Sequence, residues 1–176
     1  IAKDNMRAAR IIHILKAIFA EKYDAIPDFV SVREVIDAVL LLSQSDLNQK
    51  QIHVEMDIEK NLQIPMSFGE AQQLFINLFN NSVQALDSSK PSSKTIRIVG
   101  KQKGEITEIQ FEDNGLGVPV DQQKYLFELF TGTKREGMGL GLWLCNYIVT
   151  RHGGRIQYDS LQNTGAMFKI IFTAPV

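Results

Sequence analysis

The sequence predicts an α+β fold, a two-layer α/β sandwich in which a mixed, mostly antiparallel sheet carries helices on one face. After an N-terminal helix, segments with helical and strand periodicity follow in the order helix, strand, helix, two strands, loop, helix, two strands. Helices and strands do not alternate one for one, which argues against a doubly wound parallel sheet. Both strand pairs are joined by short turns, as antiparallel neighbours are.

The chain is expected to divide into three parts. Residues 1–24 have apolar residues at helical spacing and predict one helix, whose wide apolar face must pack on another element or another chain. Residues 25–31, which include Pro27, are interpreted as a linker, and residues 32–176 as the main domain. Because the chain begins with isoleucine rather than methionine, we expect it to be a fragment of a longer protein or a processed product.

Periodicity and capping define the first elements of the main domain. A helix ending near Gln51 is followed by a strand over 52–58 in which every second residue is apolar. Ser67 and Glu70 have the S-x-x-E spacing of a capping box, so the next helix should begin just after Ser67. Further along, we expect a hairpin turning at 103–105, a helix that begins in GLWL and is stopped by two glycines, and a final hairpin.

Composition argues against several classes of function. Lys and Arg number 19 against 20 for Asp and Glu, and this net charge of −1 gives no support to a nucleic-acid or membrane-surface partner. The single cysteine, Cys145, allows no internal disulfide and favours a reducing, cytosolic setting. We expect Cys145 to be a small core residue rather than a nucleophile. No apolar run reaches the roughly 18 residues of a membrane span.

Two common nucleotide-binding fingerprints and zinc motifs are missing from the chain. The pattern G-x-x-x-x-G-K-[ST] does not occur, and GMGLGL fails G-x-G-x-x-G because position 142 is leucine. No Cys/His cluster has zinc spacing.

The segment EDNGLGVP ends a strand in which Ile109, Phe111 and Asp113 share a face. A carboxylate on a half-buried face needs a hydrogen-bond donor. Asp-Asn-Gly alone would indicate an ordinary turn, but Gly117 and Pro119 go beyond what a hairpin needs. The segment therefore predicts a loop whose glycines let a ligand approach the backbone.

The segment GMGLGLWL places three glycines, at 137, 139 and 141, at the start of a helix. Free backbone N–H groups there suit an anion such as phosphate. A single basic pair usually belongs to a solvated loop. Its closeness to the glycines favours a phosphate contact for Lys134, and less so for Arg135.

The most apolar predicted helix, FINLFNNSVQAL, contains three asparagines. Asn77 and Asn81 share a face and lie between apolar neighbours, which suggests the floor of a cleft, with an ordinary solvent face as the alternative. Asn80 is expected to face water. Amide oxygens suit Mg²⁺, which takes few protein oxygens together with phosphates and water.

Four segments, in this order, resemble the N box, first glycine box, F box and second glycine box of sensor histidine kinases. They are NLFNNSVQAL, DNGLGVP, LFELF and TKREGMGLGLWL. The resemblance covers roughly residues 32–176. It implies the Bergerat-type α/β sandwich of the GHKL group, to which gyrase B subunits, MutL proteins and heat-shock chaperones also belong, with ATP as substrate and Mg²⁺ as cofactor.

The same resemblance implies roles for individual residues. Asp113 would accept a hydrogen bond from the adenine amino group, while Gly115 and Gly117 would shape the adenine pocket. Asn81 would bind Mg²⁺, and Asn77 would support the phosphates or metal-bound water.

The resemblance also implies a mobile ATP lid over residues 118–136, with Phe127 and Phe130 anchoring it. Asn77 and Lys134 are the residues implied to act in the transfer itself. The residues implied to lie at the phosphates are Lys134, Gly137, Gly139, Leu140 and Gly141.

The sequence departs from the family pattern at several positions. Ser67 stands where the helix cap is usually aspartate, and Ser82 stands where alanine is usual. Ala166 and Met167 occupy positions where a hydroxyl residue is common, which leaves Thr164 as a candidate for the second adenine contact.

Asn77 also bears on the type of reaction. Hydrolysing members of the group resemble one another in having glutamate there, as a base for the attacking water, and an amide cannot take a proton at neutral pH. Transfer of the γ-phosphoryl group to a histidine needs mainly alignment and charge compensation, so a kinase is favoured. A GHKL-type ATPase that couples hydrolysis to conformational change and a nucleotide-sensing scaffold are the alternatives.

The family's acceptor histidine is followed by an acidic residue, with a proline a few residues on. None of His13, His53 and His152 has this context. The first helix resembles the second dimerisation helix of the family, so the acceptor would lie upstream of Ile1. The implied partners are the dimerisation helix that bears the acceptor, a cognate response regulator and a second copy in a homodimeric parent, with no nucleic acid.

Overall fold

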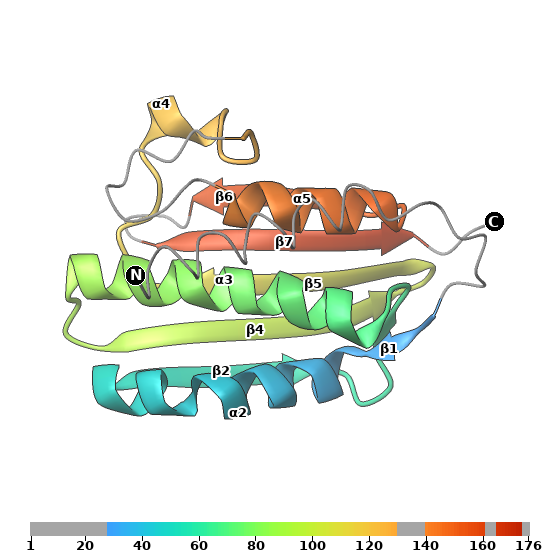
Figure 1. Ribbon diagram of the computed structural model, residues 1–176, viewed down its shortest axis with the longest axis horizontal. Helices are drawn as coiled ribbons and strands as arrows, with labels where there is room; N and C mark the ends of the chain where they lie inside the picture. The colour runs from blue at the N-terminus through green and yellow to red at the C-terminus, as the bar shows by residue number, and fades with distance from the viewer. Residues whose placement is uncertain (1–27, 130–139, 161–164, 174–176) are drawn as a thin grey trace, which may run out of the picture.

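The computed structural model describes residues 28–129, 140–160 and 165–173. Its centre is a five-stranded sheet in the order β2-β4-β5-β7-β6 (Figure 1). The strands are β2 (Ile52–Ile58), β4 (Lys94–Lys103), β5 (Ile106–Asp113), β6 (Arg155–Ser160) and β7 (Ala166–Thr173). The β2–β4 pair is parallel and the other three pairs are antiparallel, which confirms the prediction of a mixed, mostly antiparallel sheet.

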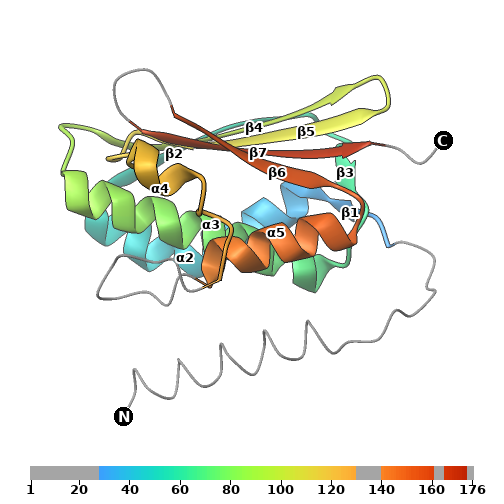
Figure 2. The same cartoon turned by 90° about the horizontal axis from the view of Figure 1, so that it is seen from above.

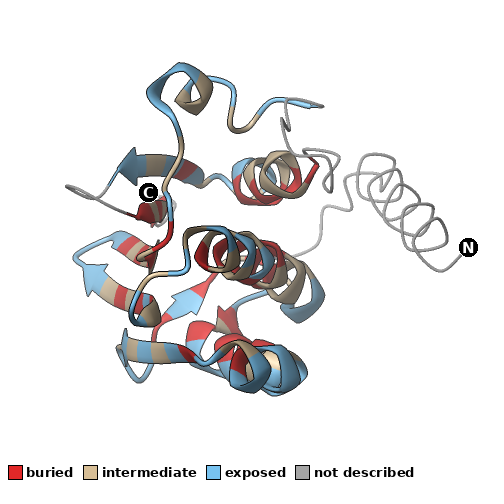
Figure 3. Cartoon of the chain, turned by 90° about the vertical axis from the view of Figure 1, so that its left-hand side faces the viewer, coloured by how far each residue is buried: buried red, intermediate tan, exposed pale blue. Residues whose placement is uncertain are grey.

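Three helices cover one face of this sheet (Figure 2). They are α2 (Val32–Lys50), α3 (Phe68–Ser89) and α5 (Gly141–Arg151). The central helix α3 contacts both of the others, and buried residues gather where the helices meet the sheet (Figure 3). The two-layer prediction is therefore confirmed. The predicted N-terminal helix, residues 1–24, lies outside the described residues.

Local signals fix the ends of these helices. The side chain of Ser67 accepts a hydrogen bond from the backbone N–H of Glu70. The carboxylate of Glu70 accepts one from the backbone N–H of Ser67, so the predicted capping box is present. Burial raises the pKa of Glu70, but hydrogen bonds from Ser67 and the nearby His152 outweigh that effect and leave the pKa below its ordinary value. Helix α5 stops before Gly153, whose φ of 74° lies in the left-handed region.

Three short elements have no periodic signal in the sequence. The strands β1 (Val30–Ser31) and β3 (Gln63–Ile64) form a two-stranded antiparallel pair, and α4 (Val120–Gln123) is a single turn. Val30 and Ser31 fall within the expected linker 25–31, and the structure pairs them with β3. Two residues are too few for strand alternation to be visible.

No helix within the described ranges is both long and apolar enough to cross a membrane.

Candidate functional site

One end of the site is built around a buried carboxylate at the end of β5. Asp113 is only 4% exposed and lies on the same side of the sheet as Phe111, as its parity predicted. Its Oδ2 accepts a hydrogen bond from the Ser82 hydroxyl at 2.8 Å, and its Oδ1 accepts one from the Gly115 N–H at 2.9 Å. Both bonds favour the ionised carboxylate, which can only accept hydrogen bonds.

Three glycines allow the backbone to pack tightly around this carboxylate. A Cβ at Gly115 would lie 2.8 Å from Asp113 Oδ1, and a Cβ at Gly117, where φ is 67°, would lie 2.7 Å from the carbonyl oxygen of Gly165. Gly165 has a φ of 117°, and a Cβ there would lie 2.3 Å from the carbonyl oxygen of Asp113. Sequence reasoning singled out Gly115 and Gly117 but missed Gly165, whose one visible signal was its place directly before the last strand.

The other end of the site is formed by α3 and the start of α5. Asn77 is 2% exposed and Asn81 is half-buried. A Cβ at Gly141 would lie 3.9 Å from Asn77 Oδ1 and 4.0 Å from Asn81 Oδ1. The structure therefore brings both predicted asparagines to the first residue of α5. Asn80 is exposed, as expected.

Several polar groups at this end point to a ligand. The Nδ2 atoms of Asn77 and Asn81 are buried and have no hydrogen-bond partner among the described residues, and the N-terminus of α5 has no side-chain cap. Asn77 Oδ1 accepts a hydrogen bond from Gln73 Nε2 at 3.3 Å, an orienting contact that sequence reasoning missed. Unpaired amide donors beside free helix N–H groups suit an anion such as phosphate.

The donor set also fits Mg²⁺ held together with a nucleotide. Within the described part of the chain, no group of three or more His, Cys, Asp or Glu side chains could hold a metal by itself. The side chains of Asn77 and Asn81 would supply one or two amide oxygens. Such a small number of protein oxygens is what Mg²⁺ uses when phosphates and water complete its shell.

Other predicted site residues have different outcomes. Leu140 is 6% exposed and belongs to the hydrophobic core, so only its backbone could reach a ligand. Five further predicted residues lie outside the described residues, and their roles stay predictions. They are Phe130, Lys134, Gly137, Gly139 and Thr164.

The start of the predicted lid is tied to the last hairpin. The backbone N–H of Val118 donates to the Tyr158 hydroxyl at 3.0 Å. Phe127 packs edge-on against Phe168 on β7 at 6.5 Å, and Phe168 in turn packs against Tyr158 at 5.5 Å. Burial raises the pKa of Tyr158, so its hydroxyl stays neutral at physiological pH.

Cys145 is fully buried in the core, as expected. Burial raises the pKa of its thiol to about 12, and its Sγ lies 3.7 Å from the carbonyl oxygen of Leu74. A thiol in this state is not a nucleophile at neutral pH.

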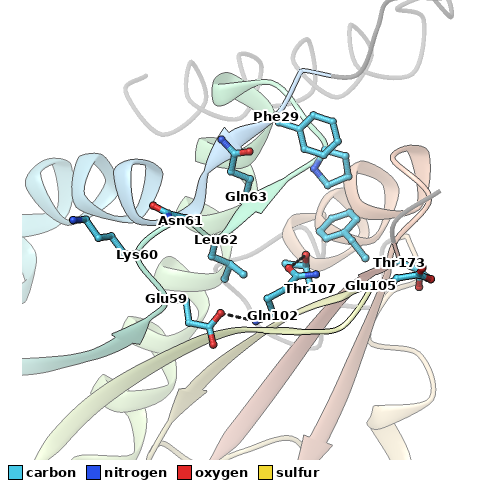
Figure 4. A pocket seen from close by; sticks show the side chains of 12 residues that line it. Phe29, Glu59, Lys60, Asn61, Leu62, Gln63, Gln102, Glu105, Thr107 and Thr173 are labelled. Atoms are coloured by element: carbon cyan, nitrogen blue, oxygen red, sulfur yellow. Dashed lines mark hydrogen bonds between the residues drawn. The ribbon is translucent and has the colours of Figure 1, made fainter. Parts of the chain in front are cut away.

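A separate pocket of about 580 Å³ lies at the other end of the sheet (Figure 4). Its lining includes Leu62, Thr107 and Thr173. Asp113 pairs with Ala166 at the start of β7, seven residues before Thr173. At about 3.3 Å per residue these ends are roughly 23 Å apart, so the pocket is not part of the site at Asp113.

Comparisons with known proteins bear on the family and the fold. Residues 69–176 match the family model described as "Histidine kinase-, DNA gyrase B-, and HSP90-like ATPase". The sensor histidine kinase ZraS of Escherichia coli O157:H7 is 29% identical over 170 residues, which cover 96% of this chain and 36% of that protein. The chain spans about a third of the length of the curated relatives that it matches.

Solved structures show the same fold. The Acinetobacter baumannii histidine kinase AdeS has a TM-score of 0.76 at 20% identity, over 96% of this chain and 79% of that chain. A structure of the histidine kinase ThkA in complex with the response regulator TrrA has a TM-score of 0.71 at 17% identity, over 97% of this chain and 49% of that chain. With the family model covering more than half of its length, this chain belongs to the histidine kinase-, DNA gyrase B- and HSP90-like ATPase family.

Proposed function

We propose that the chain is the ATP-binding kinase domain of a two-component sensor histidine kinase, which transfers the γ-phosphoryl group of ATP to a histidine on a dimerisation helix. One observation carries the proposal. Helix α3 holds Asn77 and Asn81 at the uncapped start of α5, and one residue further along, Ser82 contacts the buried carboxylate of Asp113. One helix therefore joins two neighbouring regions. One is rich in hydrogen-bond donors and suits phosphates, and the other has a carboxylate that only accepts hydrogen bonds and suits the adenine ring.

At the base end, the carboxylate of Asp113 is the group that would accept a hydrogen bond from the adenine amino group. A guanine base carries a carbonyl oxygen at that position, which an ionised carboxylate repels, so the site favours adenine. Gly115 and Gly117 let the backbone pack closely around the carboxylate, and this packing would hold it in place for the base.

At the phosphate end, the free N–H groups of α5 and the unpaired amide donors would orient the triphosphate. The amide oxygen of Asn81 is the proposed ligand of Mg²⁺, and the side chain of Lys134 is proposed to contact the phosphates. When bound, Mg²⁺ would supply charge compensation on the phosphates.

The side chain of Asn77 decides between transfer and hydrolysis. Its amide cannot accept a proton at neutral pH, and its oxygen already accepts a hydrogen bond from Gln73. The chain thus offers no base at this position to activate water. Transfer to an imidazole nitrogen, which is already a nucleophile, depends on alignment instead.

The proposed partners follow from this activity. They are the dimerisation helix that bears the acceptor, a second copy of the parent protein and a response regulator that receives the phosphoryl group. The complex of ThkA with TrrA supports the last of these. We place the domain in the cytoplasm, where ATP is supplied.

The proposal is tested by mixing the chain with γ-labelled ATP, Mg²⁺ and the dimerisation helices encoded by the same gene. We expect acid-labile label on a histidine of those helices and little release of free phosphate when they are omitted. ATP binding without any phosphohistidine would rule out the kinase. Steady phosphate release without the helices would support the ATPase instead.

The role of Asp113 is tested separately by calorimetry. Asp113→Asn replaces one acceptor oxygen with a donor and removes a charge, so we expect ATP affinity to fall about 10- to 150-fold, from about 1.5–3 kcal/mol for a hydrogen bond to a charged group. Asp46→Asn, at an exposed position on α2 away from the proposed site, is the matched control and should bind ATP as the wild type does. Unchanged affinity in Asp113→Asn would remove the adenine role.

A further inference from the structure

Ser82 makes an unusual contact for a serine in a helix. Ser88 and Ser89, in the last turns of α3, donate to the carbonyl oxygens of Gln84 and Ala85, both at 2.9 Å. This back-bonding to the residue four positions earlier is common for serines within helices. Ser82, in contrast, is 0% exposed and directs its hydroxyl out of its helix to Asp113 Oδ2 at 2.8 Å, 31 residues away.

The contact fixes the orientation of the carboxylate. The terminal torsion of an aspartate is broad, so a carboxylate held by one donor can still rotate. In this site Gly115 N–H holds Oδ1 and Ser82 holds Oδ2, and both bonds together define the carboxylate plane. A plane that is set before binding does not have to be ordered when the ligand arrives, and this increases affinity.

The same contact also stabilises negative charge on the carboxylate. A hydroxyl that donates to Oδ2 favours the ionised form of Asp113, because hydrogen bonds to a charged carboxylate stabilise the charge. Tyr158 also interacts electrostatically with Asp113, and its hydroxyl is neutral. Ser82 therefore favours the acceptor-only state that recognises an amino group.

We propose that Ser82 is a positioning residue that orients the Asp113 carboxylate for the exocyclic amino group of the purine, so that its hydroxyl contributes to selectivity for adenine. Its effect is transmitted through Asp113 alone. The inference rests on the proposed function, since it assumes that Asp113 binds the base. This role of Ser82 differs from a purely structural one, because its effect on affinity depends on the amino group of the ligand.

The test is a binding cycle with two ligands. The affinities of ATP and of purine riboside triphosphate, which lacks the amino group, are measured for the wild type and for Ser82→Ala. We expect Ser82→Ala to weaken ATP about three- to tenfold and to change the analogue less than twofold, because only ATP uses the oriented carboxylate. Ser88→Ala, a matched removal of a back-bonded hydroxyl, should leave both affinities unchanged.

A second variant keeps the test decisive if Ser82→Ala does not fold. Ser82→Cys nearly keeps the volume of the side chain and replaces a strong donor with a weak one, so it should show the same selective loss. An equal loss for both ligands, or an unchanged ATP affinity in a folded variant, would overturn the inference. Failure of the wild type to bind ATP would instead contradict the proposed function, and with it this inference.

Discussion

Gly165 is the position where one methyl group should disturb the fold and the site together. In Gly165→Ala the new Cβ would lie 2.3 Å from the carbonyl oxygen of Asp113, whereas ordinary contact begins near 3.4 Å. One of the two backbones must therefore move by about 1 Å. The φ of 117° adds strain, because L side chains rarely adopt that region.

The size of the effect follows from these two terms. Backbone strain of this kind costs about 1–3 kcal/mol, and overpacking costs about 1–3 kcal/mol. We expect Gly165→Ala to lower the free energy of unfolding by about 2–6 kcal/mol, a large share of the 5–15 kcal/mol typical of a domain. Because the displaced oxygen belongs to Asp113 itself, ATP affinity should fall as well, by about tenfold or more.

Gly104→Ala is a control that separates the effect of backbone strain from the effect of steric overlap. Gly104, in the turn between β4 and β5, has a φ of 61°, and no atom outside its own turn lies within 4 Å of the position that an alanine Cβ would take. The substitution therefore meets backbone strain alone, about 1–2 kcal/mol. Urea unfolding and ATP calorimetry are run on both variants. Equal stability losses in the two variants, with ATP affinity intact in Gly165→Ala, would refute the steric reasoning.

Three further predictions concern groups around the site. Tyr158→Phe removes the acceptor for the Val118 N–H. It should lower the free energy of unfolding by about 1 kcal/mol and raise the rate at which a protease cuts the predicted lid, measured by limited proteolysis. The pKa of Glu70 is lower in the folded chain than its ordinary value of 4.5. The ionised side chain therefore stabilises the fold at pH values above 4.5, and this stabilisation is lost as the pH falls through the folded-state pKa. Unfolding curves from pH 7 to 3 should therefore show a smaller acid loss in Glu70→Gln. Cys145, with a thiol pKa of about 12 and full burial, should react with a thiol reagent at pH 8 only after urea unfolding, and rapid labelling of the folded chain would contradict its place in the core.

Periodicity and capping were enough to predict the main elements of the fold. Strand alternation predicted the burial of Asp113, and helical spacing predicted that Asn77 would be buried and Asn80 exposed. The box formed by Ser67 and Glu70 located the start of α3. Each of these signals is local, so a few neighbouring residues contain all the information that the prediction needs.

What the sequence could not predict depends on contacts between distant segments. Ser82 looked like one small residue in place of another, because its bond to Asp113 depends on how α3 lies over β5. Gly165 was missed for a related reason, since its contact follows from the β5–β7 register that places Ala166 opposite Asp113. Register and helix placement are tertiary properties, and no pattern within either segment determines them.

The arrangement along α3 explains why the proposed base recognition and the proposed phosphate positioning should respond together to changes in this helix. Asn81 and Ser82 are consecutive, yet the first lies at the start of α5 and the second at the end of β5, because successive residues of a helix point about 100° apart. A rotation or a one-residue shift of α3 would move both groups at once. A mutation that displaces α3 should therefore weaken the proposed adenine contact and misalign the phosphates in the same step. Changes confined to Gly115 or to α5 should affect one of these functions alone.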